Sequence, residues 1–324
     1  MQAQKICLLA GLLFSLTLQA QNPYERVDSI MRAYEKKVNT EEDLWRLSYF
    51  IRHTFSEDSL RLRAAFIWIT KNIEYDIKAF QNEDNRAAQL HYVLRKKRAI
   101  CSGYANLLKY FCDTYKIENE LISGRARALR SDIHIMNMRF QSNHAWNAVK
   151  INNQWRLIDP TWAAGVITDE DERDEVVKLK YQASLEEYYY FTPPERFSLN
   201  HYPSDLRFIF VPKTGTYKEF AQAPLLTTEY LKGTLSAVSP NLALVEARVG
   251  DTLTFRFRSK EPIHDVNFFS KREKAGCIAP AREVNGWYEV QYPVAVTGYY
   301  DVNLAFNDDR FASVVYKVRI GSKL

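Results

Sequence analysis

Apolar and polar residues alternate with a helical period over residues 25–115. Apolar positions recur every three or four residues, clearly so between residues 62 and 73, which predicts amphipathic helices. Thr40 and Asp43 have the spacing of a capping box, which predicts that a helix begins just after Thr40. Apolar residues between 104 and 115 predict a further helix, directly behind a Cys-Ser-Gly sequence.

The apolar period then shortens towards two, which predicts strands. Residues 133–140, 144–151 and 154–159 have this pattern, and Asn152-Asn153 between the last two predicts the turn of a β-hairpin. Residues 168–180 are highly charged, so we expect a surface loop or a short helix there.

The last hundred residues have a different pattern. Apolar and polar side chains alternate in short runs separated by turn residues, at 253–258, 264–270, 287–296, 298–306 and 311–320. Short strands at this spacing are typical of a β-sandwich. A linker is expected at 213–224, where Gly and Pro interrupt any regular pattern.

These elements predict an α+β fold followed by an all-β domain. We expect a domain with N-terminal helices and an antiparallel sheet at 21–215, and an immunoglobulin-like β-sandwich at 225–324. A length of 324 residues agrees with two domains at about 150 residues each. The 46% hydrophobic and 26% charged residues exclude a long disordered chain.

The distribution of charge argues against a nucleic-acid partner. The chain has 44 basic and 39 acidic residues, a net charge of +5, and the two signs are interspersed. Nucleic-acid binding needs a concentrated basic face, which this distribution does not indicate. No segment after residue 20 is long and apolar enough to predict a membrane span.

The N-terminal residues have the pattern of a secretory signal peptide. Lys5 precedes an apolar run at residues 6–18, and the small residue Ala20 precedes a polar stretch. The run is shorter than the roughly 20 residues that span a bilayer. We therefore expect a signal peptide over residues 1–20, cleavage after Ala20, and export to the periplasm or the exterior. A buried apolar helix is the alternative interpretation.

Export would remove Cys7 and leave three cysteines, Cys101, Cys112 and Cys277. An odd number outside the cytoplasm leaves at least one thiol free or bridges two molecules. Cys112 lies close to three helical turns after Cys101, so we expect it on the same helix face and in the core. A bridge between Cys112 and Cys277 stays open.

Cys101 directly precedes a predicted helix. At such a position backbone N–H groups and the helix dipole stabilise a thiolate. The basic residues 95–98 either add to this effect or face solvent. Ser102 and Gly103 lack bulk, so we expect a substrate to approach the sulfur closely.

The predicted hairpin brings a carboxylate to a histidine. If Ile151 faces Gln154, then His144 faces Thr161, and Asp159 is the diagonal neighbour of His144 on the same face. Diagonal neighbours lie about 7–8 Å apart, within reach of an imidazole and a carboxylate. A shift of one residue would place the two side chains on opposite faces.

The hairpin face that carries His144 is otherwise largely apolar, with Trp146, Ala148, Trp155 and Leu157. We expect this face to pack against the helix of Cys101. Trp162 is expected to complete the core around the site or to line a cleft.

Cys101, His144 and Asp159 supply a nucleophile, a base and an orienting acid, the parts of a triad for acyl transfer. The start of the Cys101 helix would donate an N–H group to the oxyanion, and Tyr75 and Gln89 are candidates for a second donor. No cofactor is implied. No metal site is expected, because no His or Cys pair has ligand spacing.

Several sequence blocks resemble the transglutaminase-like superfamily, whose core is papain-like: RAAFIWITKNIEYD, AICSGYANLLKYFC, SGRA and NHAWNAVKINNQWRLIDPTWAAG. The later block YYYFTPPERFSLNHYP looks like the branch that includes the kyphoscoliosis peptidase. The resemblance covers about residues 58–212. It implies an α+β fold with Cys101 as nucleophile, His144 as base and Asp159 as its partner. His201, in the last block, is expected to be structural.

We therefore expect an exported cysteine acyl-transfer enzyme that hydrolyses amide bonds in peptides or peptide-like polymers. Animal crosslinking transglutaminases carry Trp where this chain has Ser102, and no calcium-loop pattern is evident. A protein-crosslinking transglutaminase and a non-catalytic binding or scaffold protein are the alternatives. The expected partner is a protein or peptide substrate, with the β-domain helping to recognise or position it.

Overall fold

The structure is a computed structural model. It describes residues 24–127, 139–170, 178–212, 215–233, 235–270, 277–307 and 309–322. The predicted signal peptide, its cleavage after Ala20 and most of the predicted strand at 133–140 lie outside the described residues. Residues 24–212 are called the N-terminal region below, and residues 225–322 the C-terminal region.

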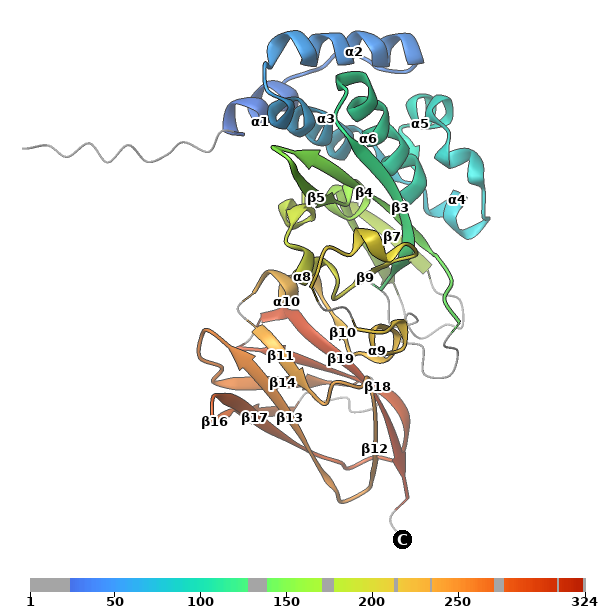
Figure 1. The fold of residues 1–324 in the computed structure, drawn as a ribbon. Coiled ribbons are helices and arrows are strands. Elements are labelled where there is room, and N and C mark those ends of the chain that lie inside the picture. The colour runs from blue at the N-terminus through green and yellow to red at the C-terminus, as the bar shows by residue number, and fades with distance from the viewer. Residues whose placement is uncertain are drawn as a thin grey trace, which may run out of the picture.

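Helices form one end of the N-terminal region (Figure 1). They are α1 (Glu25–Arg32), α2 (Glu41–Thr54), α3 (Asp58–Asn72), α4 (Ile77–Gln81), η1 (Asn85–Ala88), α5 (Leu90–Lys96) and α6 (Cys101–Tyr115). The predicted capping box is confirmed, because the Thr40 hydroxyl accepts from the Asp43 N–H and the Asp43 carboxylate accepts from the Thr40 N–H. The helical period thus predicted this part of the fold correctly.

A five-stranded antiparallel sheet lies beside these helices, in the order β8-β5-β4-β3-β9. Its strands are β3 (Asn119–Ala126), β4 (His144–Ile151), β5 (Gln154–Ile158), β8 (Tyr190–Thr192) and β9 (His201–Pro203). Two short parallel strands, β1 (Glu74–Tyr75) and β2 (Arg98–Ala99), pair just before α6. The α+β class expected from the sequence is confirmed.

The register of the predicted hairpin is correct. Ile151 pairs with Gln154, and Asn152 and Asn153 both have positive φ angles, as a tight two-residue turn requires. Regular pairing ends at Ile158, so Asp159 caps the next helix instead of continuing the strand. His144 therefore has no strand partner at position 161.

The face of β4 that meets the cysteine helix is the opposite of the expected one. The side chain of Asn147 donates a hydrogen bond to the carbonyl of Ala105 in α6, so the odd-numbered side chains of β4 point to α6. Trp146 instead packs against Phe197 of α8 (Pro194–Phe197), and Trp155 stacks against Phe210. A sheet covered on both faces carries apolar residues on both, so the apolar pattern did not distinguish them.

The charged stretch predicted as a loop or short helix begins and ends in strands, which corrects that expectation for its two ends, while residues 171–177 lie outside the described residues. After α7 (Pro160–Ala164), β6 (Gly165–Glu170) pairs antiparallel with β7 (Lys178–Ala183). The short elements η3 (Glu187–Tyr189) and η4 (Leu206–Phe208) follow in the same region. Cross-strand pairing overrides the low strand propensity of charged residues here.

The expected linker also contains a helix. In α9 (Tyr217–Gln222), Thr216 and Glu219 form a capping box, and Phe220 buries its ring beside Tyr202 and Ile209. A local capping box and a buried aromatic side chain thus contribute to the order of this segment, which the scattered Gly and Pro residues did not indicate.

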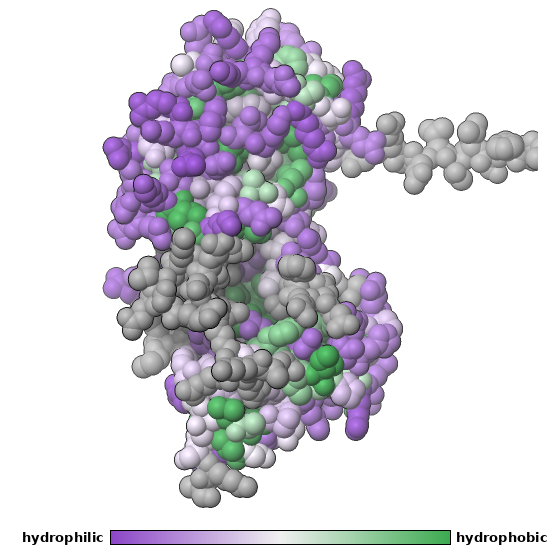
Figure 2. All heavy atoms as spheres, turned by 180° about the vertical axis from the view of Figure 1, so that it is seen from behind, coloured by the Kyte–Doolittle hydropathy of each residue, from purple (hydrophilic) through white to green (hydrophobic). Residues whose placement is uncertain are grey.

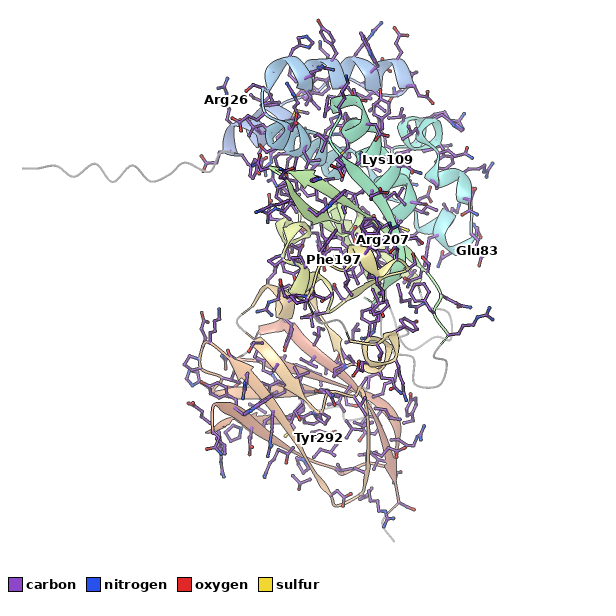
Figure 3. The ribbon with its side chains drawn as sticks, in the orientation of Figure 1. Arg26, Glu83, Lys109, Phe197, Arg207 and Tyr292 are labelled. Atoms are coloured by element: carbon purple, nitrogen blue, oxygen red, sulfur yellow. The ribbon has the colours of Figure 1, made fainter. Side chains whose placement is uncertain are left out.

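The C-terminal region is a β-sandwich, as expected. One sheet has the order β10-β19-β18-β14-β15, with β12 paired to β19, and the other has the order β11-β13-β17-β16. The strands are β10 (Leu225–Leu226), β11 (Leu235–Ser239), β12 (Leu244–Arg248), β13 (Thr252–Ser259), β14 (Asp265–Phe269), β15 (Cys277–Pro280), β16 (Arg282–Val284), β17 (Trp287–Pro293), β18 (Gly298–Phe306) and β19 (Asp309–Gly321). Buried Tyr292 belongs to the apolar core shared by the two sheets (Figure 3).

Direct hydrogen bonds tie the N-terminal region to the rest of the chain. The buried side chain of Arg127 donates to the carbonyls of Phe220 and Ala223, in the segment between the two regions, and Arg196 donates to the carbonyl of Leu235 in the C-terminal region. Hydrophilic residues cover much of the helical end of the molecule (Figure 2). Among the described residues, no helix has the length and apolar character needed to cross a membrane.

Candidate active site

Cys101 is the first residue of α6. The parallel pairing of β1 with β2 holds the two residues before Ile100, and Ile100 is the N-cap of the helix. N–H groups in the first turn of a helix have no partner within the helix, and the helix dipole favours an anion there. The fold thus places the Cys101 sulfur where a thiolate is stabilised, as the sequence predicted.

The basic residues 95–98 do not contribute to this site. Arg95, Lys96 and Arg98 are exposed, and the ammonium group of Lys97 binds the carbonyl of Val38. The sequence left open whether these four residues stabilise the thiolate or face solvent, and three of them face solvent.

Gly103 has a packing role that the sequence did not indicate. A Cβ atom at Gly103 would lie 2.4 Å from the carbonyl oxygen of Ala87 and 2.9 Å from the Cβ of Ala99. Contacts this short are not sterically possible without backbone movement. The missing side chain lets η1 and β2 lie directly against the cysteine helix.

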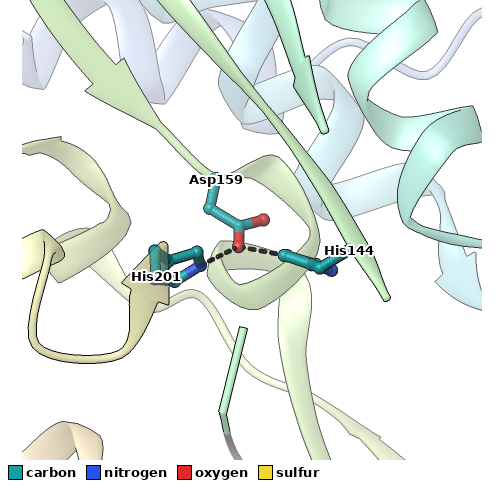
Figure 4. A group of neighbouring side chains, drawn as sticks. All are labelled: His144, Asp159 and His201. Atoms are coloured by element: carbon teal, nitrogen blue, oxygen red, sulfur yellow. Dashed lines mark hydrogen bonds and ion pairs between the residues drawn. The ribbon is translucent and has the colours of Figure 1, made fainter. Parts of the chain in front are cut away.

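His144 and Asp159 form a buried pair at the edge of the sheet (Figure 4). Nε2 of His144 lies 2.7 Å from Oδ2 of Asp159. Oδ1 of Asp159 accepts hydrogen bonds from the N–H groups of Thr161 and Trp162, at 2.9 and 3.1 Å. The carboxylate is therefore both the N-cap of α7 and the partner of the imidazole.

The Cys101 thiol contacts the imidazole of His144 at the ring nitrogen that Asp159 does not bind. A hydrogen bond links the His144 ring to the Cys101 thiol, and because Nε2 is occupied by Asp159, Nδ1 is the nitrogen left for sulfur. The N–H of Ala145 also donates to this sulfur. The structure thus brings together the three residues selected from the sequence, from α6, β4 and the start of α7.

The electrostatics of the three residues favour charge separation. Burial acts to raise the pKa of Cys101, but the hydrogen bond and charge of His144 outweigh it and hold the thiol pKa below its ordinary value. Burial likewise acts to lower the pKa of His144, and the Asp159 carboxylate overrides this and raises it to about 10. The pKa of Asp159 lies well below its usual range, because the His144 charge and hydrogen bond outweigh the cost of burial. These directions favour a thiolate beside an imidazolium.

His201 is the residue whose contact the sequence missed. It was expected to be structural, yet its Nε2 lies 3.1 Å from Oδ2 of Asp159, the same oxygen that binds His144 (Figure 4). The one available signal was its position in the Asn-His-Tyr-Pro block. No period or spacing relates it to Asp159, which is 42 positions away.

Aromatic side chains surround the two imidazoles. The half-buried Trp162 lies with its ring centroid 5.5 Å from that of His144 and 4.5 Å from that of His201. Buried Trp146 lies 6.0 Å from the His144 ring. Trp162 thus lies beside the site as expected, together with Trp146, whereas Trp155 packs elsewhere.

Of the two candidates for a second oxyanion donor, Tyr75 is near the site. Burial, followed by the charges of Cys101 and Asp159, raises the pKa of Tyr75 well above its ordinary value. Gln89 is exposed at the N-cap of α5.

His144, Asp159 and His201 offer three metal-ligand atoms within 4.8 Å of one another. Ligands drawn from residues so far apart cannot be found by short spacing motifs. Here Nε2 of His144 and Nε2 of His201 both lie at hydrogen-bond distance from Oδ2 of Asp159. The nitrogens that would bind an ion are therefore already hydrogen-bonded to the carboxylate. The arrangement therefore fits a hydrogen-bonded triad better than a metal centre.

The other cysteines differ from Cys101. Cys112 is buried in the core as expected, and burial raises its pKa to about 12. Cys101, Cys112 and Cys277 are all free thiols, so the bridge between Cys112 and Cys277 is not present.

Comparison with known proteins agrees with this geometry. Residues 48–160 match the family model of the transglutaminase-like superfamily. Human kyphoscoliosis peptidase is 26% identical over 303 residues, which are 93% of this chain and 43% of that protein. The mouse kyphoscoliosis peptidase is 26% identical over 260 residues, 80% of this chain and 38% of that protein. The chain thus spans less than half the length of these two relatives.

Two solved structures are also similar to part of the chain. A transglutaminase (TGase) structure shares 16% identity, with a TM-score of 0.30, over 42% of this chain and 36% of its own. A structure described as a proposed cysteine protease from Cytophaga hutchinsonii shares 18% identity, with a TM-score of 0.30, over 42% of each chain. The sequence matches thus make residues 48–160 similar to the transglutaminase-like superfamily, and most of the chain similar to the kyphoscoliosis peptidases.

Proposed function

We propose that this protein is an exported cysteine acyl-transfer enzyme that hydrolyses amide bonds in peptides or peptide-like polymers. The observation that carries the proposal is the buried His144–Asp159 pair, which contacts a thiol of lowered pKa at a helix start. Perturbed titratable groups that converge on one nucleophile are typical of active sites. The proposed roles are nucleophile for Cys101, base and acid for His144, and orienting acid for Asp159.

The geometry supports a two-step reaction. The Cys101 thiolate attacks the amide carbonyl carbon, and the oxyanion that forms is stabilised by N–H groups at the start of α6. His144 then donates its proton to the leaving amine, the C–N bond breaks, and a thioester remains on Cys101. Water attacks the thioester while His144 takes one of its protons, which releases the acid and restores the thiolate–imidazolium pair.

Transfer to an amine rather than to water would make the protein a crosslinking transglutaminase. Ser102 stands where animal crosslinking enzymes carry Trp, which favours hydrolysis. Incubation of the protein with peptides and an amine donor, followed by mass spectrometry, separates the two reactions. Amine incorporation that depends on Cys101 would replace hydrolysis with transfer.

Site-resolved alkylation tests whether Cys101 is a nucleophile at all. Iodoacetamide should label Cys101 well below the ordinary thiol pKa of 9.0, because the thiolate is the reactive form. The rate at low pH should fall in His144→Ala, with labelling of Cys277 in the same sample as the control for reagent and handling. A Cys101 profile that follows glutathione in wild-type protein would contradict the enzyme and leave a binding or scaffold protein.

The pH dependence of hydrolysis follows from the same two groups. Activity should rise as Cys101 loses its proton, below pH 9, and fall as His144 loses its proton near pH 10, because the leaving amine then has no acid to protonate it.

Export is tested separately by fractionation of producing cells and N-terminal sequencing, where a mature protein beginning at Gln21 is expected.

A further inference from the structure

One oxygen of Asp159 is shared by two imidazoles. Oδ2 lies 2.7 Å from Nε2 of His144 and 3.1 Å from Nε2 of His201, while Oδ1 is held by two backbone N–H groups of α7. A carboxylate accepts hydrogen bonds and cannot donate them, so Nε2 of His201 carries a proton and donates it. His201 therefore binds the oxygen that orients His144.

The surroundings of His201 make it a neutral, fixed donor. Its side chain is buried, and its ring stacks on Phe197 with centroids 3.9 Å apart. The polar and titratable groups that face it are Asp159, His144, Asn200, Tyr189 and the backbone of Phe197, which is also a hydrogen-bond partner of the ring. Burial lowers the pKa of His201 to about 4, so near neutral pH the ring adds no second positive charge beside Asp159.

We propose that His201 is a positioning residue of the active site, whose Nε2–H holds Oδ2 of Asp159 in place and thereby aligns and charges His144. The inference rests on the proposed function. Without His201, Oδ2 would be bound by His144, the ring that Asp159 is itself needed to position, so the carboxylate and the imidazole could shift together. The bond from His201 gives Oδ2 a partner other than His144. A correctly held Asp159 stabilises the His144 imidazolium, and the imidazolium stabilises the Cys101 thiolate.

His201 is itself held from the C-terminal region. Its Nδ1 lies 2.7 Å from Oδ1 of Asn200, and a half-turn of this amide brings an N–H group to the same place. The Asn200 amide lies 3.4 Å from the hydroxyl of Tyr189, which lies 2.8 Å from the hydroxyl of Thr228. Thr228 begins α10 (Thr228–Lys232), which packs into the core of the sandwich. A continuous polar chain thus leads from the sandwich to Asp159.

The test compares three variants of the full-length protein by the pH profile of Cys101 alkylation. His201→Phe keeps an aromatic ring against Phe197 but removes the donor. His201→Gln places an amide N–H near the position of Nε2, whereas the shorter His201→Asn does not reach Oδ2. Circular dichroism and thermal unfolding establish that each variant is folded.

The acid limb of the profile is the pH range in which the alkylation rate rises as Cys101 loses its proton. We expect this limb to move to higher pH in His201→Phe and His201→Asn, because the thiolate loses part of its stabilisation. At pH 6 their alkylation rates should fall about tenfold, the size expected for one hydrogen bond to a charged group. His201→Gln should keep the wild-type limb. A structural role alone would lower thermal stability without moving the limb.

Two results would overturn the inference. One is a wild-type limb in folded His201→Phe or His201→Asn. The other is an equal shift in His201→Gln and His201→Asn, which would show that the position of the donor is irrelevant. An ordinary thiol titration in the wild-type protein is a different result, since it would remove the proposed function itself rather than the role of His201.

Discussion

The N-terminal region buries charged and polar side chains, whereas the core of the C-terminal region is almost wholly apolar. Arg63, His144, Asp159 and His201 are all buried in the first, while Asn267 is the one buried polar side chain that the described residues of the second contain. The second core is built from aliphatic and aromatic residues.

Burial of charge is costly unless each group is paired. A fold that needs only stability can use an apolar core, as the sandwich does. The N-terminal region instead keeps an imidazole pair and a carboxylate in its interior, each with hydrogen-bond partners. The difference places the buried titratable groups in the N-terminal region, where the proposed chemistry lies, and leaves the sandwich with an apolar core.

The largest expected effect comes from the carboxylate that unites the site. Asp159→Asn can still cap α7 through its side-chain oxygen, but it cannot stabilise a His144 imidazolium. Catalysis should fall on the order of 10⁴-fold, the loss known for this change in a Ser-His-Asp triad, measured as kcat on a peptide substrate. The matched change in the sandwich, Asp251→Asn at an exposed turn, should leave the rate unchanged. Comparable rates for both variants would contradict the assignment of Asp159.

The next effect concerns the buried guanidinium of Arg63. It binds both oxygens of Asp28 and of Glu187, so Arg63→Met leaves a largely buried Asp28 with the longer ion pair to the exposed Arg32, at 3.8 Å. We expect a loss of about 3 kcal/mol in the free energy of unfolding, measured by urea denaturation. Arg319→Met removes the exposed pair with Glu246 in the sandwich and should cost less than about 1 kcal/mol. Equal losses would mean that burial does not distinguish the two ion pairs.

A smaller loss is expected where a helix passes close to backbone. Gly103→Ala would force a Cβ against the carbonyl of Ala87, which should cost about 1–3 kcal/mol through local displacement and slow Cys101 alkylation. In the C-terminal region a Cβ at Gly321 meets nothing within 4 Å, so Gly321→Ala should change stability by no more than about 0.5 kcal/mol. Thermal unfolding compares the two variants; a neutral Gly103→Ala would contradict the tight packing.

The smallest effect tests whether the two regions act together. Thr228→Val removes the hydroxyl that binds Tyr189, and we expect about 1 kcal/mol of lost stability with a few-fold slower Cys101 alkylation. Thr254→Val, at an exposed position of β13, is the control and should alter neither quantity. An unchanged alkylation rate in Thr228→Val would mean that the sandwich does not influence the site.

The elements predicted correctly are those set by near neighbours in the chain. The Thr40–Asp43 capping box and the Ile151–Gln154 register involve residues three positions apart, and local geometry decides them. The features that the sequence did not indicate depend on contacts between separate elements: the pairing of β6 with β7, and the packing of Gly103 against Ala87. Neither contact leaves a periodic signal in either segment.

The candidate site divides in the same way. The sequence by itself determined the types and order of Cys101, His144 and Asp159, and the turn that returns Asp159 towards His144. The tertiary structure decided which sheet face meets α6, the contact of sulfur with imidazole, and the sharing of one carboxylate oxygen with His201. Periodicity and turns depend on bonded neighbours, whereas pKa values and shared hydrogen bonds depend on burial and on groups that only the fold brings within 3 Å or so.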